Sequence, residues 1–405
     1  MATPNSTSTT AAIDLFEKCR NFTEARDYMQ LGLYPYFRVI SSAPGTEVTI
    51  QGKRLIMIGS NNYLGLTDHP KVKEAAAQAV LKYGSGCTGS RFLNGTLDLH
   101  VELETKLAEF VRKESALVFS TGFQTNLGTI SCIVGKNDTL LIDRSDHASI
   151  VDGCRLSFGK TIKFIHNDMA DLERILAGLD NGGGRLIVVD GVFSMEGDIA
   201  DLSTITRLAR RYSARVMVDD AHAVGVLGSG GRGTAEHFGI EDNVDLIMGT
   251  FSKSFASLGG FIAGDEDVIH YIKHFSRELI FSASMPPSAV AACLAALEIM
   301  KTEPERRERL WAITRRMHRE FKRLGFNIGT TETPIIPIII GEDADTFRFW
   351  RMLTDEGLFT NPIISPAVPK GQALIRTSYT ATHTDEQMDR VLEVFERVGK
   401  KTGVI

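Results

Sequence analysis

Three segments of the sequence carry side chains that could do chemistry, and each follows an apolar run. Asp219 and His222 come after ARVMV, Lys253 lies among small hydroxyl residues in GTFSKS, and His147 follows TLLIDRSD. A lysine can bond covalently to an aldehyde, an acid can keep a ring nitrogen protonated, and a histidine can stack or exchange protons. Taken singly, each residue also fits a helix cap, a core histidine or a loop lysine.

A fourth segment, FSTGF from Phe119 to Phe123, suits a phosphate. An apolar run leads into small residues and then a helix start, with Asn126 one turn later. Free N–H groups and the positive end of a helix dipole favour an anion. The segment lacks the GxxxxGK[ST] of a P-loop and the GxGxxG of a dinucleotide site. On its own it also fits an ordinary strand-to-helix connection.

Two other interpretations of these residues are weaker. A metal site at Asp219 and His222 lacks a third ligand with suitable spacing, so we expect no metal. The glycine-rich stretch over residues 84–96 could be a flexible linker, but Arg91 and Phe92 interrupt it.

A sheet is needed to bring the four segments together. Apolar runs typical of buried strands alternate with helical patterns, which predicts a mostly parallel sheet covered on both faces in an α/β fold. In such a sheet, ligands bind beyond the carboxyl ends of the strands. The strand runs cover residues 115–122, 139–146, 185–194, 214–222 and 245–252, and the helical patterns cover 70–83, 98–112 and 203–213.

The two ends of the chain differ from this middle section. We expect a frayed tail over residues 1–12, a helix within 13–40, and two short strands around Gln51–Gly52. A smaller C-terminal α+β unit is predicted from a helical region at 287–324, strands at 334–340 and 373–379, and helices at 344–356 and 384–400. The predicted domains are residues 1–60 (N-terminal arm), 61–297 (large domain) and 298–405 (C-terminal domain).

Composition limits the class of protein. The chain has 405 residues and a net charge of −5, so it has no general field for attracting nucleic acid. Five scattered cysteines without a CxxC pair argue against disulfides and favour a reducing, cytoplasmic compartment. The sequence shows no secretory signal and no run long enough to span a membrane.

A basic stretch near Arg306–Arg319 raises a question of surface function. It could touch the phosphates of lipid or coenzyme A, which leaves peripheral membrane contact open. A solvated helix face is the favoured interpretation, because Glu303, Glu305 and Glu308 are mixed among the arginines.

Considered together, the four segments match one kind of cofactor site. A phosphate seat, an acid, two histidines and a lysine all follow strands of one predicted sheet. Pyridoxal 5′-phosphate (PLP) needs these parts: a lysine for its aldehyde, an acid for its pyridine nitrogen, a flat side chain over its ring and a helix N-terminus for its phosphate.

The sequence resembles the α-oxoamine synthases, a family of fold-type I PLP-dependent transferases similar to aspartate aminotransferase. The likeness runs from about Tyr34 to Thr384 and includes SNNYLGL, GSGCTGSRFLNGT, DHASIVDGCRL, DGVFSMEGDIADL and VDDAHAVGVLGSGGRG. Within the family, GTFSKS, STGFQTNLG and FSASMPP resemble the bacterial serine palmitoyltransferases. The resemblance implies a large domain with a mostly parallel sheet and a smaller α+β C-terminal domain.

The resemblance also implies roles for matching residues. Lys253 would bond to the cofactor and then act as the base, with His147, Asp219 and His222 completing the catalytic set. His147 would stack on the ring, Asp219 would pair with the pyridine nitrogen, and His222 and Ser194 would contact the ring hydroxyl. The other implied contacts are Gly122, Phe123, Asn126, Thr250 and Ser252 with the cofactor, Ser282 from a partner subunit with its phosphate, and Asn62 and Arg376 with the amino-acid carboxylate.

The implied activity is a decarboxylative condensation of L-serine with palmitoyl-CoA to 3-oxosphinganine, CoA and CO2, the serine C-palmitoyltransferase step of sphingolipid biosynthesis. Two alternatives within the family stay open: glycine C-acetyltransferase and 8-amino-7-oxononanoate synthase. A non-catalytic subunit is disfavoured, because Lys253, Asp219, His222 and His147 are all present. The resemblance further implies a homodimer whose active sites are shared between subunits.

Overall fold

The computed structural model describes residues 14–180 and 182–405, so the predicted tail over residues 1–12 lies outside the described residues. The chain divides into two compact units, one ending at Arg38 and the other spanning Val39–Ile405. The predicted three-domain division at residues 60 and 297 stays a prediction.

The first unit holds two short helices, α1 (Glu17–Arg20) and α2 (Glu24–Gln30), neither of which has a buried residue. The single helix predicted within residues 13–40 is therefore wrong. Asn21 ends α1 and Thr23 begins α2. Side chains of these types compete for backbone hydrogen bonds, which favours them at helix ends over helix interiors.

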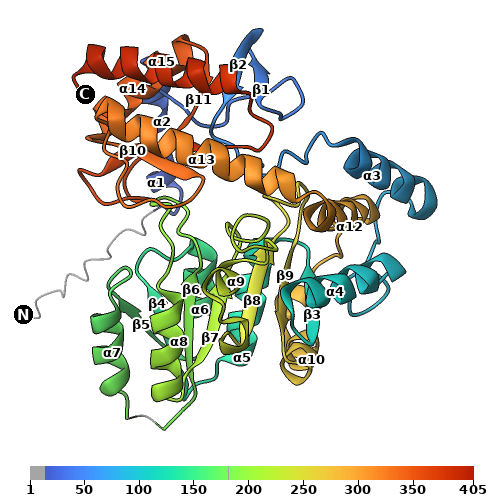
Figure 1. Ribbon diagram of the computed structural model, residues 1–405. Helices are drawn as coiled ribbons and strands as arrows, with labels where there is room; N and C mark the ends of the chain where they lie inside the picture. Colours follow the sequence, from blue (N-terminus) through green and yellow to red (C-terminus); the bar gives the residue numbers. More distant parts are fainter. Residues whose placement is uncertain (1–13, 181) are drawn as a thin grey trace, which may run out of the picture. The chain divides into compact units, whose positions relative to one another are not determined.

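A seven-stranded sheet forms the centre of the second unit (Figure 1). All of its strands run parallel except β9, which pairs antiparallel with both of its neighbours. This confirms the predicted mostly parallel sheet. In spatial order the strands are β3 (Ser115–Phe119), β9 (Gly260–Gly264), β8 (Leu246–Thr250), β7 (Arg215–Asp219), β6 (Arg185–Asp190), β4 (Thr139–Asp143) and β5 (Lys160–Phe164).

Helices cover both faces of this sheet, as the alternation of side chains along its strands requires. On β6, Leu186 and Val188 join the apolar cluster of α5 (Gly122–Ile133), α6 (Ala148–Leu156) and α10 (Glu266–Phe275). Ile187 and Val189 point to the other face. That face is covered by α4 (Asp98–Val111), α7 (Met169–Ala177), α8 (Leu202–Arg211) and α12 (Pro287–Thr302).

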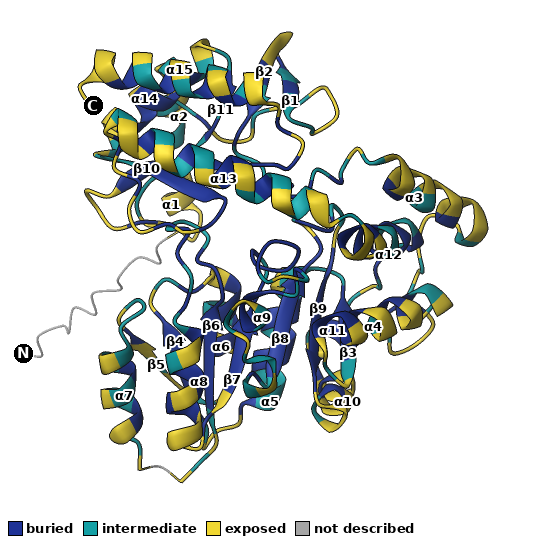
Figure 2. Ribbon diagram, viewed as in Figure 1, coloured by how far each residue is buried: buried dark blue, intermediate teal, exposed yellow. Residues whose placement is uncertain are grey.

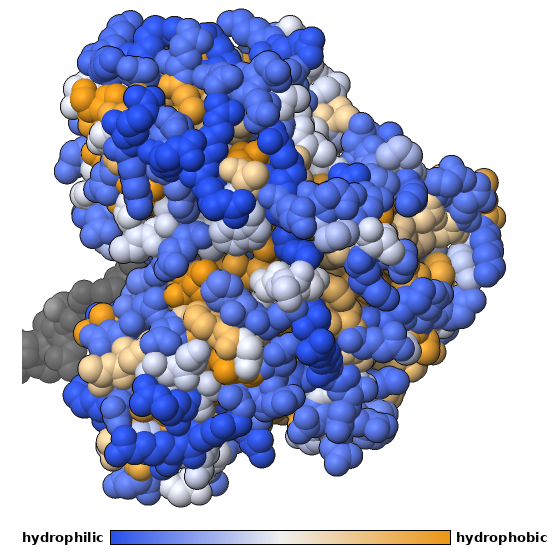
Figure 3. Space-filling model, viewed as in Figure 1, coloured by the Kyte–Doolittle hydropathy of each residue, from blue (hydrophilic) through white to orange (hydrophobic). Residues whose placement is uncertain are grey.

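The strands are buried while the outer sides of the helices are exposed (Figure 2). The surface over α8 and α10 is mostly hydrophilic (Figure 3). Within the part of the chain that the structure describes, no helix combines the length and apolarity needed to cross a bilayer. The remaining helices of this section are α3 (Pro70–Tyr83), α9 (Thr234–Phe238), α11 (Arg277–Ile280) and a 3-10 turn at Glu241–Asn243.

The C-terminal part is built on a small antiparallel sheet in the order β10–β13–β12. Its elements are α13 (Pro304–Leu324), β10 (Ile335–Gly341), α14 (Asp343–Asp355), β11 (Leu358–Phe359), β12 (Asn361–Ile363), β13 (Ala373–Ser378) and α15 (Asp385–Thr402). This confirms the predicted α+β character. A third sheet joins β1 (Glu47–Ile50) and β2 (Lys53–Met57) to β11.

The arginines of α13 contact groups of the same chain. Arg306 pairs with Glu303, and Arg309 and Arg316 contact Asp385. These ion pairs agree with the favoured interpretation of the basic stretch as a solvated helix face.

Candidate active site

Ten of the predicted site residues line one cavity of about 270 Å³ at the carboxyl ends of the central strands. Parallel strands present these ends at one edge of a sheet, so residues far apart in sequence meet there. The ten are Gly122, Phe123, Asn126, His147, Ser194, Asp219, His222, Thr250, Ser252 and Lys253.

The N-terminus of α5 forms one side of this cavity. Thr121 caps the helix, its Oγ1 accepting from the backbone N–H of Gln124 at 3.1 Å. The first N–H groups of a helix have no partner within it, so those of Gly122 and Phe123 are available to an anion. A Cβ at Gly122 would lie 2.6 Å from Thr250 Oγ1, which requires glycine at this position.

Thr250 and Ser252 bring hydroxyl groups to the same corner, with their Oγ atoms 3.0 Å apart. Backbone N–H groups and side-chain hydroxyls are the donors that a phosphate monoester takes up. The donor set here therefore fits the phosphate of the cofactor that the sequence implied.

Asp219 ends β7 and is 3% exposed. Its Oδ2 accepts from Asn126 Nδ2 at 2.7 Å and its Oδ1 from the backbone N–H of Ala221 at 3.0 Å. Asn126 Nδ2 also donates to Ser149 Oγ at 2.8 Å, while Asn126 Oδ1 is buried without a partner among the described residues. These contacts fix the Asp219 carboxylate in the cavity wall, where it can pair with a protonated ring nitrogen.

His147 begins α6 and also lines the cavity. Its Nδ1 lies 2.7 Å from Ser149 Oγ and accepts from the Ser149 backbone N–H at 3.2 Å. Burial, together with the charge of Lys253 and against the attraction of Asp219, lowers the pKa of His147. The imidazole is thus a neutral, flat ring. The sequence left open a capping histidine or a catalytic one, and this residue caps α6 while facing the cavity.

His222 is held by a residue that sequence reasoning missed, Tyr63. The Tyr63 hydroxyl lies 2.7 Å from His222 Nδ1, and both side chains are buried. Burial and the nearby charges of Lys253 and Arg376 lower the pKa of His222 well below its usual value. A neutral imidazole that accepts from Tyr63 at Nδ1 carries its own proton on Nε2, where it can donate a hydrogen bond.

Lys253 follows β8 and lines the same cavity. Burial lowers the pKa of its amine to about 8, against the opposing pull of Asp219 and Asp190 and with further help from Arg376. A substantial fraction of the amine is therefore neutral near pH 8, as a nucleophile or base must be.

Asp190 is a cavity residue to which sequence reasoning gave no role. It ends β6, and its Oδ2 accepts from the backbone N–H of His147 at 3.0 Å. Its place at the end of an apolar strand is the signal that identified Asp219, and the same signal could have found it.

The three remaining predicted site residues lie outside the cavity lining. Arg376, on β13, donates from Nε to Ser194 O at 2.6 Å and from a terminal nitrogen to Asn61 Oδ1 at 3.0 Å, which sets its guanidinium beside the cavity. The Asn62 amide bonds Thr67 and Leu66 in its own turn. Ser282 Oγ accepts from Gln124 of α5 at 3.0 Å.

Comparison with known proteins agrees with this geometry. The aminotransferase class I and II family matches residues 53–395. The chain is 55% identical over 390 residues to a serine palmitoyltransferase of Sphingobacterium spiritivorum, covering 96% of this chain and 98% of that protein. It is 44% identical over 375 residues to an 8-amino-7-oxononanoate synthase of Thermoanaerobacter pseudethanolicus, covering 92% and 95%.

One solved structure is also similar to this chain. A serine palmitoyltransferase variant from S. paucimobilis, with a bound PLP–myriocin aldimine, superposes with a TM-score of 0.94. The two chains are 38% identical, and the match covers 97% of this chain and 100% of the other.

Proposed function

The chain belongs to the class I and II aminotransferase family, in its α-oxoamine synthase group, and we propose that it is a PLP-dependent serine C-palmitoyltransferase. The reaction joins L-serine to the acyl group of palmitoyl-CoA, releasing CoA and CO2 and leaving 3-oxosphinganine. The observation that carries the proposal is the position of Lys253 in one cavity with Asp219, beside the N-terminus of α5. The higher identity to a serine palmitoyltransferase than to an 8-amino-7-oxononanoate synthase supports this substrate pair.

Several residues of the cavity have a part in the proposed chemistry. When bound, PLP withdraws electrons from the Cα of the amino acid. The α5 N-terminus, Thr250 and Ser252 would hold the phosphate, and Asp219 would keep the ring nitrogen protonated. Lys253 would hold the aldehyde of the cofactor, and its neutral amine would take the proton from Cα of the amino acid. Its lowered pKa makes the neutral amine available for that step.

Arg376 supplies the contact for the amino-acid carboxylate. Its bonds to Ser194 O and Asn61 fix the guanidinium plane at the cavity edge. A fixed guanidinium can hold a carboxylate through two parallel hydrogen bonds. Asn62 is the second predicted carboxylate contact, and in the structure its amide lies in the neighbouring turn.

A substrate panel tests the proposal. L-serine, glycine and L-alanine are each combined with palmitoyl-, acetyl- and pimeloyl-CoA, and release of free CoA thiol is measured. We expect the highest kcat/KM for L-serine with palmitoyl-CoA. Purified parent protein should show a visible absorption band from bound PLP that Lys253→Ala changes. A protein that takes up no PLP would contradict the proposed function.

8-Amino-7-oxononanoate synthase is the second candidate, and the 44% identity to such an enzyme supports it. The residues around the cofactor serve either reaction, so only the panel separates them. A higher kcat/KM for L-alanine with pimeloyl-CoA would establish the second candidate in place of the first.

The proposal includes a homodimer with active sites shared between subunits. Phe123 and Leu258 line the cavity yet are 42% and 52% exposed, and Phe281, beside Ser282, is 74% exposed. Burial of such side chains against a second subunit would stabilise the assembly. Sedimentation of the parent protein should give a dimer, and Phe281→Asp should weaken it. A monomeric parent would contradict this part.

A cytoplasmic location is the last part of the proposal. All five cysteines are unpaired, and Cys154 and Cys293 are buried as free thiols, as in a reducing compartment. Peripheral contact with a membrane during uptake of the palmitoyl substrate is tested by co-sedimentation with lipid vesicles. Cell fractionation that recovers the protein outside the cytoplasm would contradict the location.

A further inference from the structure

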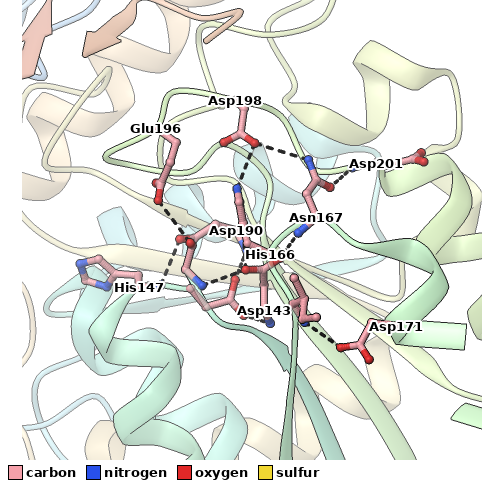
Figure 4. A network of polar contacts seen from close by, with 12 residues as sticks. Asp143, His147, His166, Asn167, Asp171, Asp190, Glu196, Asp198 and Asp201 are labelled. Carbon is pink, nitrogen blue, oxygen red and sulfur yellow. Dashed lines mark hydrogen bonds and ion pairs between the residues drawn. The ribbon is translucent and has the colours of Figure 1, made fainter. Parts of the chain in front are cut away.

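A histidine outside the cavity lies between two carboxylates (Figure 4). His166 Nδ1 is 3.0 Å from Asp143 Oδ1, and His166 Nε2 is 3.1 Å from Asp198 Oδ2. Both aspartates are buried, at 1% and 7% exposure. An imidazole that meets a carboxylate at each ring nitrogen must carry a proton on both, because neither carboxylate can donate while ionised.

Asp143 shapes the turn that carries His147. Its Oδ1 accepts from the backbone N–H of Ser145 at 2.8 Å, and its Oδ2 accepts from that of Asn167 at 2.8 Å. Asp146, in the same turn, accepts from the backbone N–H of Asp143 at 2.8 Å. The next residue is His147, whose backbone N–H donates to Asp190 Oδ2.

Asp198 belongs to the turn that carries Ser194. The backbone N–H of Phe193 donates to Asp198 O at 3.1 Å, which closes that turn. The Phe193 ring packs edge-on against His166, with centroids 4.4 Å apart. Ser194 O in turn accepts from Arg376 Nε. Displacement of the turn that holds Asp198 would therefore move Ser194 and, through the Ser194 carbonyl oxygen, the Arg376 guanidinium.

One more contact joins the two turns directly. Ser145 Oγ donates to Glu196 Oε1 at 3.2 Å. The charged groups that face His166 are thus Asp143, Asp198 and Glu196, all on these two turns.

We propose that His166, as a cation bound to Asp143 and Asp198, is a positioning residue that holds His147 and Ser194 in place in the cavity. The proposal rests on the proposed function, which gives these two residues contacts with the cofactor. An imidazolium suits the place because it is flat and has N–H groups pointing in opposite directions. No neutral side chain of similar size offers both donors in that geometry.

The electrostatics of His166 agree with this role. Burial alone would lower its pKa, but the hydrogen bonds and charges of Asp143 and Asp198 outweigh burial and raise the pKa of His166 to about 10. The cation therefore persists across the pH range in which the enzyme would work.

His166→Gln tests the proposal, because glutamine can donate to only one of the two carboxylates. The matched control is His383→Gln. His383 is also buried, also joins two segments through Met57 O and the Thr380 N–H, and lies outside the cavity lining. Both variants are compared with the parent below their melting temperatures, so that a loss of stability is measured separately.

Three readouts decide the result. In cofactor-free protein, NMR of labelled histidine should show the His147 signal shifted by His166→Gln and unmoved by His383→Gln. With PLP, the circular dichroism induced in the cofactor band should change only in His166→Gln. In the L-serine assay, kcat should fall roughly 10- to 100-fold, since displacement by about 1 Å can cost that much, while KM changes less.

Unchanged His147 signal, cofactor dichroism and kcat in His166→Gln, with only a lower melting temperature, would overturn the proposal. If that variant does not fold, Asp198→Asn is judged by the same readouts, since it keeps the side-chain size and removes one charge. The NMR arm needs neither PLP nor turnover. A failure of the proposed function, seen as a parent that binds no PLP, is therefore distinguishable from a failure of this proposal.

Discussion

Asp190 and Asp219 end neighbouring parallel strands, and their Cα atoms are paired across the sheet. The Asp219 carboxylate accepts hydrogen bonds from Asn126 and Ala221, whereas the Asp190 carboxyl accepts one from the backbone N–H of His147. Burial, and then the charges of Asp219 and Asp146, raise the pKa of Asp190 well above its usual value. At the residue scale, the Asp190 carboxyl is therefore easier to protonate than an ordinary aspartate.

The raised pKa of Asp190, and the proposed pairing of Asp219 with the cofactor, predict different results for two isosteric substitutions. Asp190→Asn should leave PLP absorbance and kcat close to those of the parent, because an amide resembles a neutral carboxyl and still accepts from the His147 N–H. Asp219→Asn should lower kcat by at least about 100-fold, because it removes charge stabilisation in a buried site. Steady-state kinetics of the two variants checks this. Equal losses of kcat in the two variants would contradict the separate roles given to Asp190 and Asp219.

His166 gives a second prediction at the residue scale, in the pH dependence of stability. Its folded pKa of about 10 exceeds the unfolded value of about 6.5. The stabilisation is fully present below pH ~6.5 and is lost as the pH rises through about 10. Urea unfolding of the parent should therefore show a free energy of unfolding that declines over this window. In His166→Gln the decline should be absent, and a parallel decline in both proteins would refute the assignment.

At the scale of elements, the strands that the sequence predicts are those whose residues are almost all buried. Strands β4, β6, β7 and β8 are buried on both faces of the sheet, so apolar residues follow one another along them almost without interruption. Edge strand β5, KTIKF, is mostly exposed and carries two lysines, so it shows no apolar run in the sequence. Strand β9, GFIAG, is rich in glycine and equally lacks a strand signal.

The site residues also divide into those whose positions the sequence predicts and those whose positions it does not. Residues that follow a predicted strand, such as Asp219 and Lys253, could be placed at one sheet edge from the sequence. The direction of a loop side chain could not, because it depends on packing rather than pattern. Adjacent Asn61 and Asn62 illustrate this: Asn61 reaches Arg376, while Asn62 bonds within its own turn. Tyr63 was missed because its partner His222 is 159 residues away.

The start of α5 supplies the prediction at this scale. Gly122→Ala should weaken PLP binding, because the added Cβ would lie 2.6 Å from Thr250 Oγ1, beside the phosphate seat. Titration of cofactor-free protein with PLP measures the effect. The control is Gly178→Ala at the end of α7, where a Cβ meets its nearest atoms at 3.6 Å. If both variants bind PLP like the parent, the phosphate seat lies elsewhere.

At the scale of the whole molecule, Gly197 joins the large sheet region to the C-terminal part. Its carbonyl oxygen accepts from Thr333 Oγ1 at 2.8 Å and from the Glu332 N–H at 3.2 Å. Its φ of +73° favours glycine, and a Cβ there would lie 2.3 Å from Ile335 O. The turn that carries Ser194 is thus held from both sides, by His166 and by the segment before β10.

Gly197→Ala should destabilise the protein more than Gly239→Ala. Gly239 has a similar φ of +67° but open space around its Cβ position, so both variants share a backbone cost of about 1–2 kcal/mol. The clash at Gly197 should add about 1–3 kcal/mol. Urea unfolding gives the two free energies. KM for L-serine should rise in Gly197→Ala alone, through Ser194 and Arg376. Equal destabilisation of the two variants would show that the chain around Gly197 accommodates the added Cβ with no further loss of stability.

The pairing of β2 with β11 affects how the protein is made. Leu358 and Phe359 lie beside Ile56 and Met57, so a strand from early in the chain is completed by one from near its end. During translation, β2 leaves the ribosome long before β11 has been synthesised. The edge of β2 that pairs with β11 stays unpaired until then. Contacts of such long sequence separation also slow folding. This edge is therefore exposed for longer during synthesis than an edge whose partner strand follows directly in the sequence.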